Sequence, residues 1–149
     1  MKLLTIYLFL CFFSNRCFSQ ITDLKYQEIM GKTAFINVYK MLRNSPNCLD
    51  KKNLILHDGN NIDPCFHLKR KLSPLLAKRV VEIFLNRNSY GKPDPNCFST
   101  DYAMILFDKE KKNIGTITMS LICNNLSFNN RPPIKLTNKA KNELVKIIR

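Results

Sequence analysis

The sequence predicts an α+β domain, in which a small antiparallel sheet is built on a β-hairpin at 102–122, packed by about three helices and tied by two disulfides. Three observations lead to this prediction. Apolar residues flank a charged turn at 108–113, two helices have clear N-terminal signals at Ser73 and Thr137, and four cysteines remain beyond residue 19. An even number of cysteines in an exported chain most often forms disulfides.

The start of the chain has the layout of a secretory signal peptide. A lysine is followed by an apolar run to Phe13, and small side chains precede Gln20, so we expect cleavage between Ser19 and Gln20. An apolar run of about eleven residues is too short to cross a bilayer core of about 30 Å. The sequence therefore predicts a signal peptide at 1–19, a single domain at 20–149 with no transmembrane segment, and a secreted or periplasmic protein.

Three helices are predicted from apolar periodicity and capping residues. The first is expected over 22–43, the second begins at Ser73 with Pro74 in its first position, and the last begins at the cap Thr137. The predicted buried stripes are Met30, Ala34, Phe35, Val38 and Leu42 in the first helix, Leu76, Val80, Ile83 and Phe84 in the second, and Ala140, Leu144, Ile147 and Ile148 in the last. Between the first two helices we expect one short strand at 54–56 and a loop.

The predicted hairpin also distinguishes among the three ways of pairing four cysteines. If the turn centres on Glu110, the numbers of opposed residues sum to 220, and odd-numbered residues share the buried face. Cys97 and Cys123 then lie opposite each other at the open end of the hairpin, within reach of a disulfide. The residues expected on the buried face are Ala103, Ile105, Phe107, Ile117, Met119 and Leu121. The predicted disulfides are Cys97–Cys123 and Cys48–Cys65.

Candidate chemistry centres on two histidines, His57 and His67. With Cys48 and Cys65 they would supply two Cys and two His ligands, but their spacing fits none of the usual structural zinc patterns. All four cysteines can pair, which leaves no free thiol for a Cys–His nucleophile. The acids are scattered without a catalytic spacing. We therefore predict no metal site, no cofactor and no catalytic residue, and the sequence favours a non-catalytic protein.

The chain is strongly basic. It contains 24 Lys and Arg against 11 Asp and Glu, a net charge of +13, and loss of residues 1–19 would remove two basic residues and leave +11. Basic clusters occur at 69–71, at 78–79 and at 109–112, without the interleaved aromatics of a nucleic-acid site. Lys outnumbers Arg by 17 to 7, and Asn is abundant, which is typical of an AT-rich genome, whereas an excess of Arg would be the better sign of dedicated phosphate recognition.

Part of the chain resembles a group of small exported bacterial proteins of unknown function. The shared pattern is a Leu-Ser helix start like Leu72-Ser73, the Cys97-Phe98 pair, an "xFYD"-type hairpin like 103–108, and a second strand that ends at Cys123. The resemblance covers residues 72–126, and Ser120 stands where that pattern often has another cysteine. It implies the hairpin fold and export, and it implies no activity.

Three functional hypotheses follow. The first is an exported, non-catalytic protein that binds an unknown protein or a component of the cell envelope or exterior. The second is a small hydrolase or toxin-like enzyme that uses His57 or His67 with a nearby Asp. The third is a polyanion-binding protein driven by net charge, with weak binding to anionic surfaces that falls steeply as salt rises.

Overall fold

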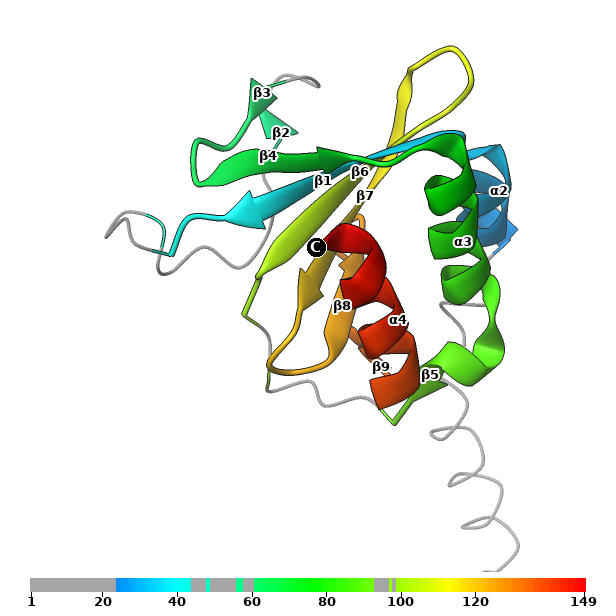
Figure 1. The fold of residues 1–149 in the computed structure, drawn as a ribbon, viewed down its shortest axis with the longest axis vertical. Coiled ribbons are helices and arrows are strands. Elements are labelled where there is room, and N and C mark those ends of the chain that lie inside the picture. Colours follow the sequence, from blue (N-terminus) through cyan, green and yellow to red (C-terminus); the bar gives the residue numbers. More distant parts are fainter. Residues whose placement is uncertain (1–23, 44–47, 49–55, 58–60, 93–96, 98) are drawn as a thin grey trace, which may run out of the picture.

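A seven-stranded antiparallel sheet forms the centre of the protein, with three helices gathered on one side of it (Figure 1). The computed structural model describes residues 24–43, 48, 56–57, 61–92, 97 and 99–149. The strand order is β4-β1-β6-β7-β8-β9-β5, and a separate two-stranded ribbon joins β2 to β3. The predicted α+β class is confirmed, with a larger sheet than the hairpin alone required.

The elements are α2 (Leu24–Lys32), β1 (Phe35–Met41), β2 (Leu56–His57), β3 (Asn61–Ile62), β4 (Phe66–Lys71), α3 (Pro74–Leu85), a short 3₁₀ helix η2 (Arg87–Ser89), β5 (Tyr90–Gly91), β6 (Tyr102–Phe107), β7 (Asn113–Ser120), β8 (Asn125–Phe128), β9 (Ile134–Leu136) and α4 (Asn138–Ile148). None of the helices in the described part of the chain is long and apolar enough to span a bilayer. The predicted signal peptide lies outside the described residues.

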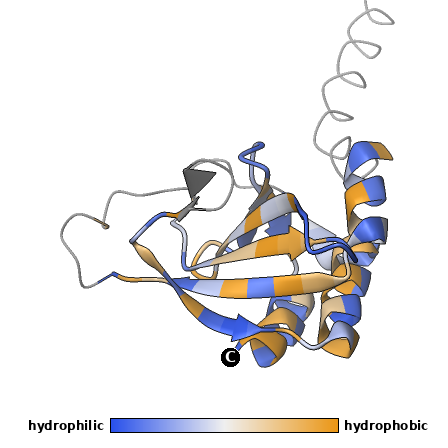
Figure 2. Ribbon diagram, turned by 90° about the horizontal axis from the view of Figure 1, so that it is seen from above, coloured by the Kyte–Doolittle hydropathy of each residue, from blue (hydrophilic) through white to orange (hydrophobic). Residues whose placement is uncertain are grey.

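The main core lies between the three helices and one face of the sheet. Successive side chains of a strand point to opposite faces of the sheet, and apolar residues are frequent along the strands and on the helices (Figure 2). The largest fully buried side chains of this core are Met30 from α2, Phe84 from α3, Leu144 and Ile148 from α4, and Ile36, Val38, Met104, Leu106, Ile117, Met119, Leu126 and Leu136 from the sheet and its strands. We call this face the helix side and the other the loop side.

The helices α3 and α4 form where their capping residues predict. The Ser73 hydroxyl accepts a hydrogen bond from the backbone N–H of Leu76, with Pro74 in the first helical turn, and the Thr137 hydroxyl accepts one from Ala140. The predicted stripe of α4 is buried at all four positions. In α3, Val80 and Phe84 are buried, whereas Leu76 and Ile83 are partly buried.

The prediction of one helix over 22–43 is wrong. In the described part of this range the helix ends at Lys32, and residues 35–41 form β1 in the middle of the sheet. The segment Phe35-Ile36-Asn37-Val38-Tyr39 is rich in aromatic and β-branched residues, which favour strands. Because Ile36 and Val38 lie two residues apart, both face the helices when the segment is extended, and pairing with β6 on one side and β4 on the other fixes it as a strand.

The predicted hairpin is confirmed, but its predicted register is wrong over most of its length. Phe107 pairs with Asn113, as a sum of 220 requires, but Leu106 pairs with Gly115 because a bulge adds one residue to β7. The Asn113 side chain accepts a hydrogen bond from the Gly115 N–H at 3.1 Å within this bulge. Even-numbered residues of β6 therefore share the helix side with Ile117 and Met119, whereas Ala103, Ile105 and Phe107 face the loop side.

Several strands had no counterpart in the sequence prediction. The basic segment 66–71 forms the edge strand β4, antiparallel to β1, and β8 and β9 extend the sheet beyond the hairpin. Five of the six residues in β4 are exposed, so its apolar pattern is weak. Of the expected strand at 54–56, the structure describes Leu56, which begins β2.

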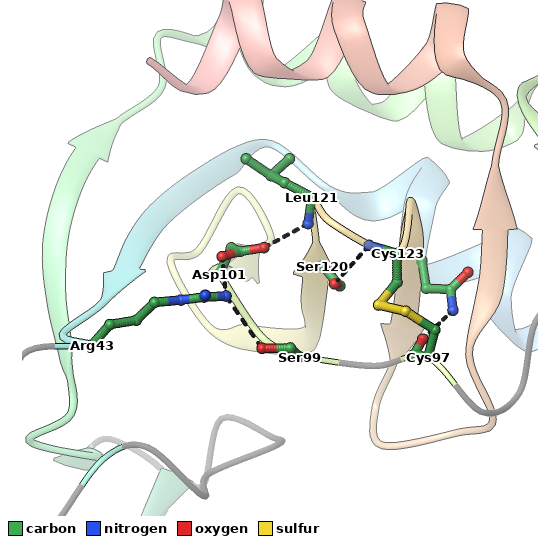
Figure 3. The surroundings of a disulfide bond; sticks show 8 residues. Arg43, Cys97, Ser99, Asp101, Ser120, Leu121 and Cys123 are labelled. Carbon is green, nitrogen blue, oxygen red and sulfur yellow. Dashed lines mark hydrogen bonds and ion pairs between the residues drawn. A yellow bond between two sulfur atoms is a disulfide. The ribbon is translucent and has the colours of Figure 1, made fainter. Parts of the chain in front are cut away.

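Both predicted disulfides are confirmed. Cys48 pairs with Cys65, with 5.4 Å between Cα atoms, and Cys97 pairs with Cys123 at 5.5 Å. The second pair forms for a different reason than predicted, because both cysteines lie outside the hairpin strands. Cys123 lies in the turn between β7 and β8, where its N–H donates to the Ser120 hydroxyl, and the Asn125 side-chain amide donates to the Cys97 carbonyl (Figure 3).

Candidate functional site

Basic side chains from four parts of the sequence meet on the helix side of the sheet, around the last turn of α4. They line two neighbouring hollows. The first has a volume of about 460 Å³ and lies between the ends of β1, β4 and β6. The second has a volume of about 430 Å³ and lies between β4, α3 and α4. We call the two hollows together the basic furrow.

The strand pattern explains why charged side chains reach the first hollow. Lys40 follows Ile36 and Val38 on the helix side of β1, and it pairs with His67 of β4 and Tyr102 of β6. Lys40 and His67 lie beyond the end of the core and are exposed, so polar side chains replace apolar ones there, whereas Tyr102 remains buried. Arg149, which follows α4, closes the hollow from above the sheet.

The second hollow continues the first along β4 and α4. Arg70 lies three residues beyond His67 on the same strand, and Lys146 lies one helical turn before Arg149. The Arg70 guanidinium donates to the Ile147 carbonyl at 2.9 Å, which places a cation at the C-terminal end of α4, where the helix dipole favours one. Arg79 of α3 completes this group.

The two hollows have an excess of positive charge. Among the described residues that line them, six are Lys or Arg and two are acids, which leaves an excess of four charges with His67 counted as neutral. The cations are Lys40, Arg43, Arg70, Arg79, Lys146 and Arg149, and the acids are Asp101 and Glu143. Cations that converge on a concave surface raise the local concentration of anions and steer them to it.

Asp101 belongs to the structural framework of the furrow. One carboxylate oxygen forms an ion pair with Arg43, and the other accepts a hydrogen bond from the Leu121 N–H at 2.6 Å (Figure 3). The Arg43 guanidinium also donates to the Ser99 hydroxyl at 3.2 Å. These contacts tie the end of β1 to the segment that leads into β6 and to the end of β7.

The two histidines considered for catalysis lie in different places. His67 lines the first hollow near Asp101, but both oxygens of that carboxylate are engaged by Arg43 and Leu121. His57 lies in β2 opposite Asn61, and its side chain falls outside the described part of the structure. Among the described residues, no three His, Cys, Asp or Glu side chains come together as a metal site.

The fold divides the basic clusters seen in the sequence. Arg70 and Arg79, from two different clusters, meet in the furrow, whereas Lys71 faces the loop side together with Lys111 of the hairpin turn. Sequence reasoning missed Lys40, Lys146 and Arg149, because each stands alone in the sequence and only strand pairing and helix packing bring them near Arg70.

Comparison of the sequence with protein-family models, with curated proteins and with solved structures gives no match.

Proposed function

We propose that this is an exported, non-catalytic protein that binds an anionic polymer of the cell envelope or exterior through the basic furrow. The observation that supports the proposal is the convergence of six Lys and Arg side chains on two adjoining hollows, with two acids among the described lining residues. The two disulfides are compatible with an exported protein.

The arrangement fits an elongated ligand better than a single small anion. The hollows adjoin along β4, where His67 and Arg70 are three residues apart, or about 10 Å in a strand. A polymer with repeated negative charges can contact both hollows at once. Cations held on different elements of a rigid frame also lose less freedom on binding than cations on a mobile tail.

The proposal is tested with heparin, a sulfated polysaccharide, as the probe. Binding of the disulfide-bonded protein should weaken steeply between low and physiological salt, because each ion pair with a polyanion releases a counterion. A double substitution of the furrow, Arg79→Gln with Lys146→Gln, should weaken binding by roughly fivefold at fixed salt and reduce its salt dependence.

The matched control is Lys109→Gln with Lys112→Gln, which removes the same charge from the exposed turn between β6 and β7. This variant should change binding by less than about twofold, since exposed pairs far from the contact contribute little. Equal loss in the two double variants, or no retention of the unmodified protein at low salt, would refute a defined site. Cleavage of the polymer that disappears in His67→Ala would overturn the non-catalytic reading in favour of the hydrolase hypothesis.

A further inference from the structure

A third hollow differs from the furrow in position and in chemistry. It lies on the loop side of the sheet and has a volume of about 320 Å³. Its lining is mostly apolar and comprises Phe35, Asn37, Lys71, Leu72, Phe107 and Lys111. We call it the aromatic pocket.

The strand register explains how the two phenylalanines come together. Phe35 of β1 is the direct cross-strand partner of Phe107 of β6, and Asn37 is paired with Lys71 on one side and Ile105 on the other. The neighbouring part of the loop side is filled by the small cluster around Tyr39, which Phe107 joins as a half-buried member. Phe35 and Asn37 are also half-buried. The two phenylalanine rings therefore leave part of their apolar surface exposed in a hollow at this end of the loop side.

The charged residues that line this pocket have one sign. Both charged residues among the described lining, Lys71 at the end of β4 and Lys111 in the hairpin turn, are cations. Lys111 adopts a left-handed backbone conformation with φ of 62°, and its N–H donates to the Asp108 carbonyl at 3.1 Å, so a tight turn positions it. The neighbouring Asp108 carboxylate accepts the Lys112 N–H at 2.8 Å and is engaged within the turn.

We propose that the aromatic pocket binds a small amphiphilic anion, namely a carboxylate with an alkyl or aryl tail. The tail packs between Phe35 and Phe107, where burial of its apolar surface drives binding. The carboxylate pairs with Lys71 and Lys111, and the Asn37 amide supplies a further donor. A volume of 320 Å³ is at the low end for ligand pockets, which favours a small molecule over a polymer.

The aromatic pocket and the basic furrow lie on opposite faces of the sheet and share none of their described lining residues. Binding of the small anion to the pocket is therefore independent of binding of the polymer to the furrow. The furrow selects repeated charge, and the pocket selects one charge joined to an apolar tail. A failure of either proposal therefore leaves the other standing.

The test uses octanoate as the probe, with acetate as the charge without the tail and octanol as the tail without the charge. Titration of the disulfide-bonded protein by NMR should show octanoate shifting the amides of Phe35, Asn37 and Phe107. Acetate and octanol should each bind at least about tenfold more weakly, since each lacks one of the two contributions.

Two variants and a matched control locate the site. Lys71→Gln with Lys111→Gln should weaken octanoate binding by about tenfold and leave octanol and heparin binding unchanged, and these exposed positions tolerate the change without unfolding. Lys109→Gln with Lys112→Gln, with the same loss of charge in the same turn, should bind octanoate normally. Asn37→Tyr, which fills the pocket with a strand-favouring residue, should abolish binding of both octanoate and octanol.

The proposal is overturned if octanoate binds no more tightly than acetate. It is also overturned if the two lysine double variants weaken octanoate equally, or if the shifted amides cluster around the basic furrow.

Discussion

The helix side and the loop side of the sheet are buried by different kinds of contact. On the helix side, apolar residues of β1, β6, β7, β8 and β9 pack against α2, α3 and α4 in one continuous core. On the loop side, the apolar cluster is small and includes Cys48 and Cys65, and β7 and β8 present buried polar residues instead. These are Thr118, Ser120, Asn125 and Ser127.

The polar residues of the loop side hold backbone segments in place. The Ser127 hydroxyl donates to the Arg131 carbonyl at 2.5 Å, and the Asn125 amide donates to the Cys97 carbonyl, also at 2.5 Å. Helices satisfy their own backbone groups and need an apolar surface, whereas irregular segments bring unpaired N–H and C=O groups that require polar partners. Helix packing therefore stabilises one side of the sheet, whereas disulfides and side-chain hydrogen bonds stabilise the other.

The largest expected difference between the two sides comes from removing one aromatic ring from each. Phe84 of α3 is fully buried in the helix-side core, so Phe84→Ala should lower the free energy of unfolding by about 3–5 kcal/mol. Phe107 is half-buried on the loop side, and Phe107→Ala should cost about 1 kcal/mol. Chemical denaturation of both variants measures the difference, and similar losses would show that the loop side is as tightly packed as the helix side.

Removing the disulfides tests how the loop side is stabilised. The Cys48–Cys65 pair spans 17 residues and Cys97–Cys123 spans 26. In the chain-entropy model their loss, as Cys→Ala pairs, costs about 3 and about 3.5 kcal/mol. Native-state hydrogen exchange should show the largest loss of protection in β4 for the first variant and in the β7–β8 turn for the second. Uniform loss across α3 and α4 would contradict a local role.

Two tyrosines on the helix side give that side a distinct pH dependence. The Tyr90 hydroxyl donates to the Phe84 carbonyl at 2.6 Å, and the Tyr26 hydroxyl lies 3.2 Å from that of Tyr90. Burial raises the pKa of Tyr90 to about 12 and raises the pKa of Tyr26 as well. Unfolded tyrosine has a pKa of about 10.

The sign of the effect follows from these raised values. Below pH 10 both tyrosines are neutral whether the chain is folded or unfolded, so their contribution is fully present. Above pH 10 these tyrosines ionise in the unfolded chain before they ionise in the folded protein. The free energy of unfolding then falls by up to about 1.4 kcal/mol per pH unit for each tyrosine, until the pH passes the pKa of that tyrosine in the folded protein. Denaturation between pH 10 and 12 should show a slope about half as steep in Tyr26→Phe as in the unmodified protein, and an unchanged slope would argue against this linkage.

The sequence predicted the helix side better than the loop side because the helix-capping signals of α3 and α4 act within a single turn of the chain. Ser73-Pro74 and Thr137 fix the starts of α3 and α4 through contacts within one turn. The residues of β1 also fit a helical stripe, and only pairing with β6 and β4 decides in favour of a strand. At the bulge, β8 restricts the side chain at position 115, since a Cβ there would lie 3.2 Å from the Phe128 ring.

The two candidate sites also depend on contacts between distant parts of the chain, so the sequence did not predict them. Lys40, Arg70 and Lys146 meet through the sheet order and the packing of α4, neither of which leaves a pattern in neighbouring residues. The disulfide pairing was correct although the register behind it was wrong, because the turn after β7 returns Cys123 to the segment that precedes β6.

The smallest expected effect concerns a single hydroxyl on the loop side. Thr118 is 3% exposed, and its hydroxyl has no hydrogen-bond partner in the described part of the structure. A buried hydroxyl without a partner destabilises the folded state, so Thr118→Val, which keeps the branched shape, should raise the free energy of unfolding by about 1 kcal/mol.

The matched control is Thr116→Val two residues earlier, where the hydroxyl lies 3.4 Å from the Asn129 side-chain oxygen and is half-exposed. That variant should be neutral or slightly destabilising in the same denaturation experiment. A loss of stability in Thr118→Val would mean that its hydroxyl is satisfied after all, and that polar contacts cover the loop side more completely than the structure shows.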